Sequence, residues 1–201
     1  MTVTQNYLHR RIILQNKAVT KPKPSYGVLT DPKLQSPDTS FLKGSMITDT
    51  IQTPMEFITN FDSENLPGSF TGNSIPIWSK RLIELFKSTG VDNLQCFDAT
   101  LKSEDGNYIW NDYFAVNVLG QAAVADLSHS DYVKICESPS GLPFLGFQKL
   151  VLDKSKINDQ LLFRLAENPI ELLAHEQLIT ALQKTKQEGG WGITALPIDE
   201  I

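Results

Sequence analysis

The hexapeptide "LSHSDY", residues 127–132, contains the side-chain types of a hydrolytic triad. Ser128, His129 and Asp131 supply a hydroxyl, an imidazole that titrates near neutral pH, and a carboxylate. A triad joins side chains from separate elements into one line of hydrogen bonds, which neighbours in sequence cannot form. Ser and Asp side chains bond readily to nearby backbone amides, so this stretch predicts a turn.

The usual sequence motifs of nucleophilic, nucleotide-binding and zinc sites are absent from the chain. The chain contains no GxSxG, GxxxxGK[ST], GxGxxG or HExxH sequence. Cys96 and Cys136 lie in predicted strands, far apart and outside any CxxC pair. A free cysteine is usually a small buried apolar group. We therefore expect no catalytic residue, no metal site and no cofactor.

Carboxylates are scattered near the ends of predicted strands. They are Asp98, Asp112, Asp126, Asp131, Asp153 and Glu167. A paired-acid site would need two of them to converge, and exposure to solvent is the more usual state of such groups. Arg164 stands inside the apolar run "LLFRLAE". Because its charge cannot be shed, we expect Arg164 either to pair with an acid, with Asp126 as the candidate, or to lie on an exposed strand face.

Aromatic residues cluster around Asp112. Tyr108, Trp110, Tyr113 and Phe114 surround it in sequence. Phe114 is expected in the core, whereas Trp110 and Tyr113 suit either the core or an interface, where aromatic side chains anchor a partner. The candidate partner-binding residues are therefore Trp110, Asp112 and Tyr113, together with Asp126 and Asp131.

Two segments that must position these residues resemble each other. Setting Ser79 against His175 aligns "SKRLIELF" with "HEQLITAL", so that apolar residues fall on one face at the same positions. Ser79 is the expected N-cap of a helix over residues 80–89, and Gly90 offers its stop. His175 takes the equivalent place before the second helix.

Between these helices the apolar residues alternate with a period of two, as in "YFAVNV". Short turns separate the runs, so we expect an α+β fold with a largely antiparallel sheet and a few short amphipathic helices. The first part of the chain is rich in proline and predicts an irregular N-terminal arm. The expected division is an arm over residues 1–44 and a single α+β domain over residues 45–201.

Charge is unevenly distributed along the 201 residues. The first 35 residues carry six basic side chains and one acidic one, whereas the whole chain has a net charge of −5. The remainder is therefore strongly acidic, which disfavours nucleic acid and favours a basic partner, although it also suits an ordinary soluble surface. No segment has the pattern of a signal peptide or a membrane span, so a cytoplasmic location is expected. The sequence assigns no oligomeric state.

Three stretches taken together, "IPIWSKRLIELFKSTGV", "YFAVNVLGQAAVADLSHSDY" and "FQKLVLDKSKINDQLLFRLAENPIELLAHEQLITALQKTKQEGGWGI", resemble the myxococcal-type immunity proteins of bacterial polymorphic toxin systems. The likeness covers residues 75–195 and rests on the order of a capped helix, an "NVL" strand, an "FRL" strand and a second capped helix. It implies a cytoplasmic, non-catalytic protein that binds and neutralises a cognate toxin. Two alternatives stay open: a small hydrolase or transferase with a carboxylate or histidine site, and an adaptor that docks through its basic arm.

Overall fold

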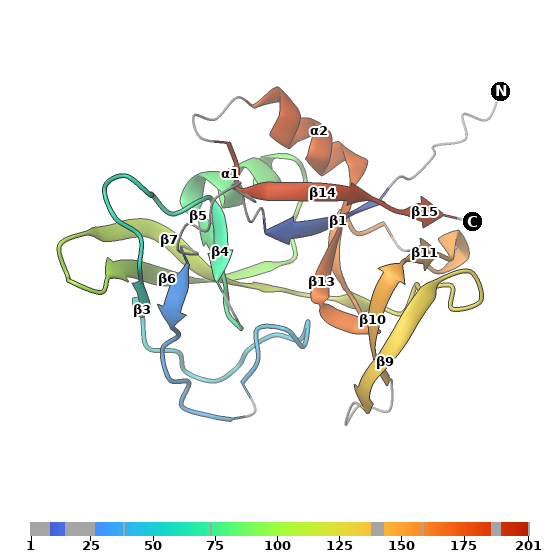
Figure 1. Ribbon diagram of the computed structural model, residues 1–201, viewed down its shortest axis with the longest axis horizontal. Helices are drawn as coiled ribbons and strands as arrows, with labels where there is room; N and C mark the ends of the chain where they lie inside the picture. The colour runs from blue at the N-terminus through green and yellow to red at the C-terminus, as the bar shows by residue number, and fades with distance from the viewer. Residues whose placement is uncertain are drawn as a thin grey trace, which may run out of the picture.

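The computed structural model describes residues 9–14, 27–37, 39–72, 74–137, 143–157, 159–185 and 190–200. Within these ranges the chain forms two main sheets, two short two-stranded sheets and two α-helices (Figure 1). Residues 1–8 and 15–26 of the predicted arm lie outside the described residues.

The first main sheet has five strands in the order β14-β1-β13-β12-β8. Their bounds are β1 His9–Leu14, β8 Gln121–Ala122, β12 Leu162–Leu165, β13 Asn168–His175 and β14 Ile193–Pro197. β1 pairs antiparallel with β13 on one side and with β14 on the other. A strand from the start of the chain therefore lies inside a sheet built from its end.

The second main sheet has six strands in the order β2-β3-β6-β7-β5-β4. Their bounds are β2 Val28–Thr30, β3 Met55–Thr59, β4 Phe70–Gly72, β5 Pro76–Ser79, β6 Leu94–Ser103 and β7 Ile109–Val118. The long hairpin of β6 and β7 forms its centre, and β3 adds to β6 in parallel. In the second half of β6, buried residues alternate with more accessible ones, which gives this sheet two distinct faces.

Two smaller pairs complete the sheets. β9 Asp131–Glu137 and β10 Pro143–Lys149 form an antiparallel ribbon, while β11 Val151–Leu152 and β15 Asp199–Glu200 pair in parallel. A single turn of 3-10 helix, η1 Lys154–Lys156, follows β11. Figure 1 shows the β6–β7 hairpin and the β9–β10 ribbon at opposite ends of the long axis of the molecule.

Each α-helix begins directly where a strand ends. α1 Lys80–Ser88 follows β5, and α2 Glu176–Lys184 follows β13. The hydroxyl of Ser79 accepts a hydrogen bond from the Leu82 amide at 3.3 Å, and the His175 ring nitrogen Nδ1 accepts one from the Gln177 amide at 3.2 Å. Both predicted caps are confirmed. Gly90 ends α1 with a φ of +110°, a conformation that L side chains rarely adopt, so its predicted stop is also confirmed.

One core joins the two main sheets and both helices. A single cluster contains buried residues of both main sheets and both helices. The six-stranded sheet contributes Trp78, Val116 and Val118, and the five-stranded sheet contributes Ile12, Leu162, Leu172 and Ala174. The helices contribute Leu82, Ile83, Phe86, Leu178, Ile179 and Leu182. A second cluster lies on the opposite face of the six-stranded sheet beneath the segment that contains Phe41 and Ile47, and a third lies behind the five-stranded sheet. Burial of apolar surface on both faces of each main sheet stabilises the fold.

The α+β class with mostly antiparallel pairing is confirmed in outline, with three corrections. The strands belong to several sheets rather than one. β3–β6, β8–β12 and β11–β15 pair in parallel, because segments distant in sequence return beside each other. The predicted irregular arm is wrong for β1 and β2, whose backbone groups bond within the main sheets. The domain boundary at residue 44 stays a prediction. Among the described residues, no helix has the length and apolarity needed to cross a membrane.

Candidate functional site

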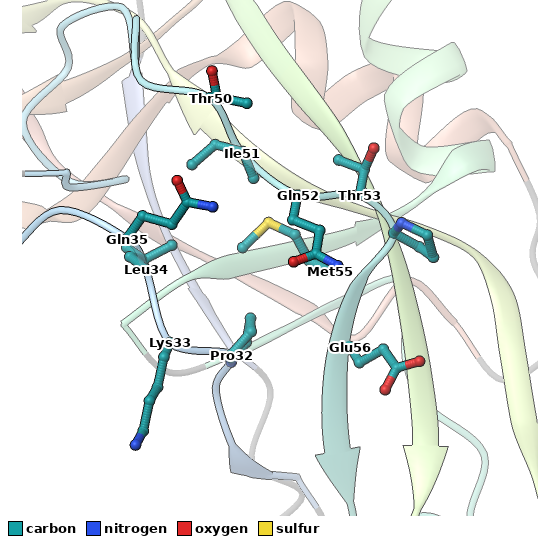
Figure 2. Close-up of a pocket in the computed structure, with 11 residues that line it drawn as sticks. Pro32, Lys33, Leu34, Gln35, Thr50, Ile51, Gln52, Thr53, Met55 and Glu56 are labelled. Carbon is teal, nitrogen blue, oxygen red and sulfur yellow. The ribbon is translucent and has the colours of Figure 1, made fainter.

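One cleft lies between residues 32–35 and residues 50–56 and has a volume of about 430 Å³. Figure 2 shows the amides of Gln35 and Gln52 directed between the two segments, with Met55 beneath them. Lys33 and Glu56 are the ionisable residues of its lining, and Lys33 extends away from the other lining side chains. Acid–base chemistry would need two ionisable groups that converge, and the residues that line this cleft do not provide such a pair.

A second cleft of about 400 Å³ runs beside α2 and β14. Arg10 donates through Nε to Glu176 at 2.8 Å within its lining, and Trp191 contributes an apolar wall. The indole N–H of Trp191 donates to the carbonyl of Leu182 at 3.0 Å, and the Arg81 guanidinium lies 5.5 Å from the ring centroid. Arg10 and Glu176 therefore neutralise each other, and Trp191 is held in place by Leu182 and Arg81. These contacts have a structural role.

The Ser128–His129 stretch forms the predicted turn. Asp126 accepts hydrogen bonds from the amides of Ser128 and His129 at 2.9 and 3.2 Å, and its second oxygen lies 3.1 Å from His129 Nδ1. These bonds, first that from the Ser128 hydroxyl and then that from His129, lower the pKa of Asp126 to about 2. His129 is exposed, and the described hydrogen-bond partners of the Asp126 side chain are its own sequence neighbours. The turn interpretation is confirmed.

Three carboxylates near this turn gather around one lysine. Lys156 lies 3.0 Å from Asp153, and the pKa of Lys156 is raised, chiefly by that hydrogen bond and with smaller contributions from Asp126 and Glu167. Glu167 is buried, which raises the pKa of its carboxyl group, and it accepts the Ala125 amide at 3.2 Å. None of these four residues lines either of the two clefts described above. The attraction between the Lys156 ammonium group and the three carboxylates explains why they lie together.

Arg164 corrects a prediction. The side chain is only 1% exposed, and its Nη1 donates to the carbonyl of Pro169 at 2.7 Å. Within the described part of the chain no acid pairs with it, so both the acidic partner Asp126 and the exposed face are wrong. β12 lies between β13 and β8 and is buried along its whole length, which forces the side chain into the interior. Burial lowers the pKa of Arg164 to about 10.

In the aromatic cluster, Trp110 and Tyr113 lie on one face of the six-stranded sheet, whereas Phe114 packs against the core on its other face. Tyr113 is buried, and its hydroxyl donates to the Pro67 carbonyl at 3.0 Å; burial raises its pKa to about 12. Trp110 is half-buried, stacks on Tyr108 with ring centroids 6.1 Å apart and meets Phe61 edge-on. Asp112 is exposed. The two aromatic residues thus support the strand that presents Asp112.

The predicted site residues do not form one group. Asp112 lies in the β6–β7 hairpin, whereas Asp126 and Asp131 precede or begin the β9–β10 ribbon at the other end of the molecule (Figure 1). Asp131 is exposed, as is every residue of β9. Their assignment to partner binding stays a prediction.

A buried polar contact was missed by sequence reasoning. His9 is 1% exposed, and both its amide and its Nδ1 contact Glu200 Oε1, at 2.6 and 3.1 Å. The ring of His175 lies edge-on at 5.4 Å. Burial lowers the pKa of His9, while the bond and charge of Glu200 act in the opposite direction. His9 and Glu200 are 191 positions apart in the sequence, so no local pattern could indicate this contact.

Two sheets packed on one core, with a capped helix at the end of a strand in each, define the class of this protein as an α+β protein without a disulfide among its described residues. The model of the immunity protein family (Imm11) matches residues 9–195. The chain belongs to this family, and the predicted resemblance to immunity proteins is confirmed. Immunity proteins act against toxins and are generally non-catalytic. No curated protein matches the chain.

Proposed function

We propose that this chain is a non-catalytic immunity protein that binds a cognate toxin in the cytoplasm of the producing cell and neutralises it. Membership of the immunity protein family over residues 9–195 carries this proposal. Inhibition by binding needs a rigid surface that fits the toxin and requires no reacting group. Inhibitory complexes typically bury about 1,600 Å² in total, an area that a domain of this size offers.

The charge of the chain indicates the chemistry of the toxin. The net charge is −5, and the basic residues Arg10 and Arg11 are paired with Glu176 and Glu171 inside the fold. Long-range attraction accelerates the capture of a basic protein by an acidic one. We therefore infer a toxin with a basic surface, a property that suits toxins acting on nucleic acids or nucleotides.

The two alternative functions receive less support. A hydrolase would require an acid or histidine pair in a cleft, and the described His129–Asp126 pair lies on an exposed turn outside both clefts. An adaptor docking through its N-terminal arm would need that segment free, whereas β1 occupies an interior position in the five-stranded sheet.

Co-expression with the toxin tests the proposal. The protein encoded beside this chain's gene is expressed in a heterologous bacterium from an inducible promoter, with and without this chain. We expect the toxin to arrest growth alone and this chain to restore it, with the two proteins purifying as a complex. Growth arrest that this chain leaves unrelieved, or a toxin that elutes without it, contradicts the proposal.

A further inference from the structure

One half of a face of the six-stranded sheet is uncovered. Towards β5 this face packs under α1, where Trp78 meets Phe86 edge-on with centroids 5.6 Å apart and Phe114 lies against the core. Further along β6 and β7 neither α1 nor α2 lies over this face, and Figure 1 shows the hairpin continuing beyond α1. We call this uncovered half the open face; its residues are Glu56, Ile58, Asp98, Thr100, Lys102, Ile109, Asn111 and Asp112.

Strand register places these residues together. Glu56 pairs with Thr100 and Ile58 with Lys102 across β3 and β6, while Lys102 pairs with Ile109 across β6 and β7. Their neighbours Ala99, Leu101 and Tyr113 alternate with them and are buried on the opposite face. A β-bulge sets both Asn111 and Asp112 opposite Thr100, which donates a hydrogen bond to Asn111 at 3.1 Å.

The open face carries uncompensated negative charge. Glu56, Asp98 and Asp112 are all exposed, and in the described part of the chain none of them makes an ion pair. Lys102 is the one basic residue of the open face, so the carboxylates are in excess. The adjoining turn adds Glu104 and Asp105, both exposed.

The β9–β10 ribbon also exposes apolar residues but differs in its charge. The β9–β10 ribbon presents Val133 and Ile135, each 56% exposed, but its charges balance: Lys134 pairs with Glu137 and Lys149 with Asp199, which leaves Asp131 as a carboxylate without a described ion pair. A basic partner would find matching charge on the open face rather than on this ribbon.

The open face also combines charge with apolar contact on a rigid base. Ile109 is 54% exposed beside the carboxylates. Beneath the sheet, Trp110 stacks on Tyr108, and Tyr113 is held by its bond to Pro67. Strand residues fixed in this way lose little conformational freedom on binding, which favours affinity.

We propose that the open face is the docking surface for the toxin, and that it receives a patch of lysine and arginine side chains around an apolar contact at Ile109. The proposal rests on the proposed immunity function and specifies its binding surface. A second copy of this chain is a poor occupant, since two such faces would oppose carboxylate to carboxylate.

Matched charge reversals test this assignment. The open-face variant is Glu56→Lys/Asp98→Lys/Asp112→Lys. The control variant is Glu84→Lys/Asp92→Lys/Asp159→Lys, which changes the net charge equally at exposed carboxylates outside the open face. The toxin is purified as the complex, released from this chain in denaturant and refolded, and its binding is measured by biolayer interferometry at about 0.15 M ionic strength.

We expect the open-face variant to bind with an association rate constant lowered at least about tenfold and a Kd raised about a hundredfold, and the control to stay within about threefold of the unmodified chain. Circular dichroism melting of each variant checks folding. If the open-face variant fails to fold, Glu56→Gln/Asp98→Asn/Asp112→Asn replaces it, with a smaller expected loss in the same direction.

The outcomes separate the two proposals. Equal binding by the open-face variant and the control overturns the docking surface and leaves the immunity function in place. An unmodified chain that does not bind the toxin overturns both. A dimer of the unmodified chain in size-exclusion chromatography that the open-face variant loses assigns the surface to a second copy and overturns the docking proposal.

Discussion

Arg164 places a cation inside the protein with little to compensate it. Its described partner is the Pro169 carbonyl, and its Nε and Nη2 atoms are buried without a hydrogen-bond partner in the described part of the chain. A buried charge is retained at a cost in stability unless it is paired, and an apolar side chain of similar volume is often tolerated in its place.

We therefore expect Arg164→Met to leave the free energy of unfolding unchanged or to raise it by about 1 kcal/mol. Arg164→Ala should lower it by about 3 kcal/mol, because that change leaves a cavity. Urea denaturation of both variants measures these effects. A loss of more than about 3 kcal/mol in Arg164→Met would mean that the guanidinium has a strong ionic partner, and the description of an uncompensated cation would be wrong.

His9 makes stability depend on pH. Its pKa in the folded protein lies below the ordinary value of 6.5, first because burial disfavours the imidazolium. The unfolded chain therefore binds a proton that the folded chain does not, over the interval between the folded pKa and 6.5. Stability falls as the pH is lowered through this interval, by at most about 1.4 kcal/mol per pH unit for one group.

The measurement is urea denaturation at pH values of about 7.5, 6.5 and 5.5, with His9→Gln as the comparison. We expect the unmodified protein to lose more stability on acidification than the variant, which retains polar contact with Glu200 but cannot titrate at this position. Subtracting the two curves isolates the contribution of His9. Parallel curves would show that His9 is not the group responsible.

At the level of secondary-structure elements, the repeated pattern of a cap followed by spaced apolar residues correctly predicted both helices. Ser79 and His175 both cap a helix that starts directly from a strand, and the aligned pairs Leu82 and Leu178, Ile83 and Ile179, and Phe86 and Leu182 are all buried in the same cluster. Local spacing predicted these positions because each helix buries one face against the same core.

The equivalence leads to a paired prediction. Leu82 and Leu178 are both 0% exposed. Leu82→Ala and Leu178→Ala should each lower the free energy of unfolding by about 3 kcal/mol, from lost apolar burial and the cavity left behind. Glu84→Ala on the exposed face of α1 should change it by less than about 0.5 kcal/mol. Chemical denaturation compares the three, and a large loss in one leucine variant alone would show that the helices do not share the core equally.

Contacts between segments that are distant in sequence could not be predicted from local spacing. The parallel pairing of β3 with β6 depends on a crossover through β4, β5 and α1, and neither strand encodes its partner. The same holds for the contact between His9 and Glu200. Asp112 was identified as a candidate from its aromatic neighbours, but Glu56 and Asp98 become its companions only through strand register. For the same reason the sequence did not reveal that Asp112 and Asp126, both candidate partner-binding residues, lie in different parts of the fold.

At the scale of the whole molecule, strands from the first and the last parts of the chain pair in one sheet. The N-terminal strand β1 fills the position between β13 and β14, and Ile12 enters the core that also holds both helices. Arg10 and Arg11 form ion pairs with Glu176 and Glu171. The basic start and the acidic remainder of the chain, which seem segregated in sequence, therefore compensate each other in the fold.

Ile12→Pro tests whether β1 belongs to the folded body. Proline lacks an amide donor, so in an interior strand it removes a ladder hydrogen bond and is strongly disfavoured. Ile12 is also 6% exposed, so its core contacts would be lost with the strand. We expect the variant to melt at a lower temperature or to be recovered as aggregate, and to lose protection against the toxin. Ile12→Val, which keeps the strand, should cost only about 1 kcal/mol and preserve protection. If Ile12→Pro melted and protected like Ile12→Val, β1 would be dispensable, and the N-terminal segment would again be available to dock another protein.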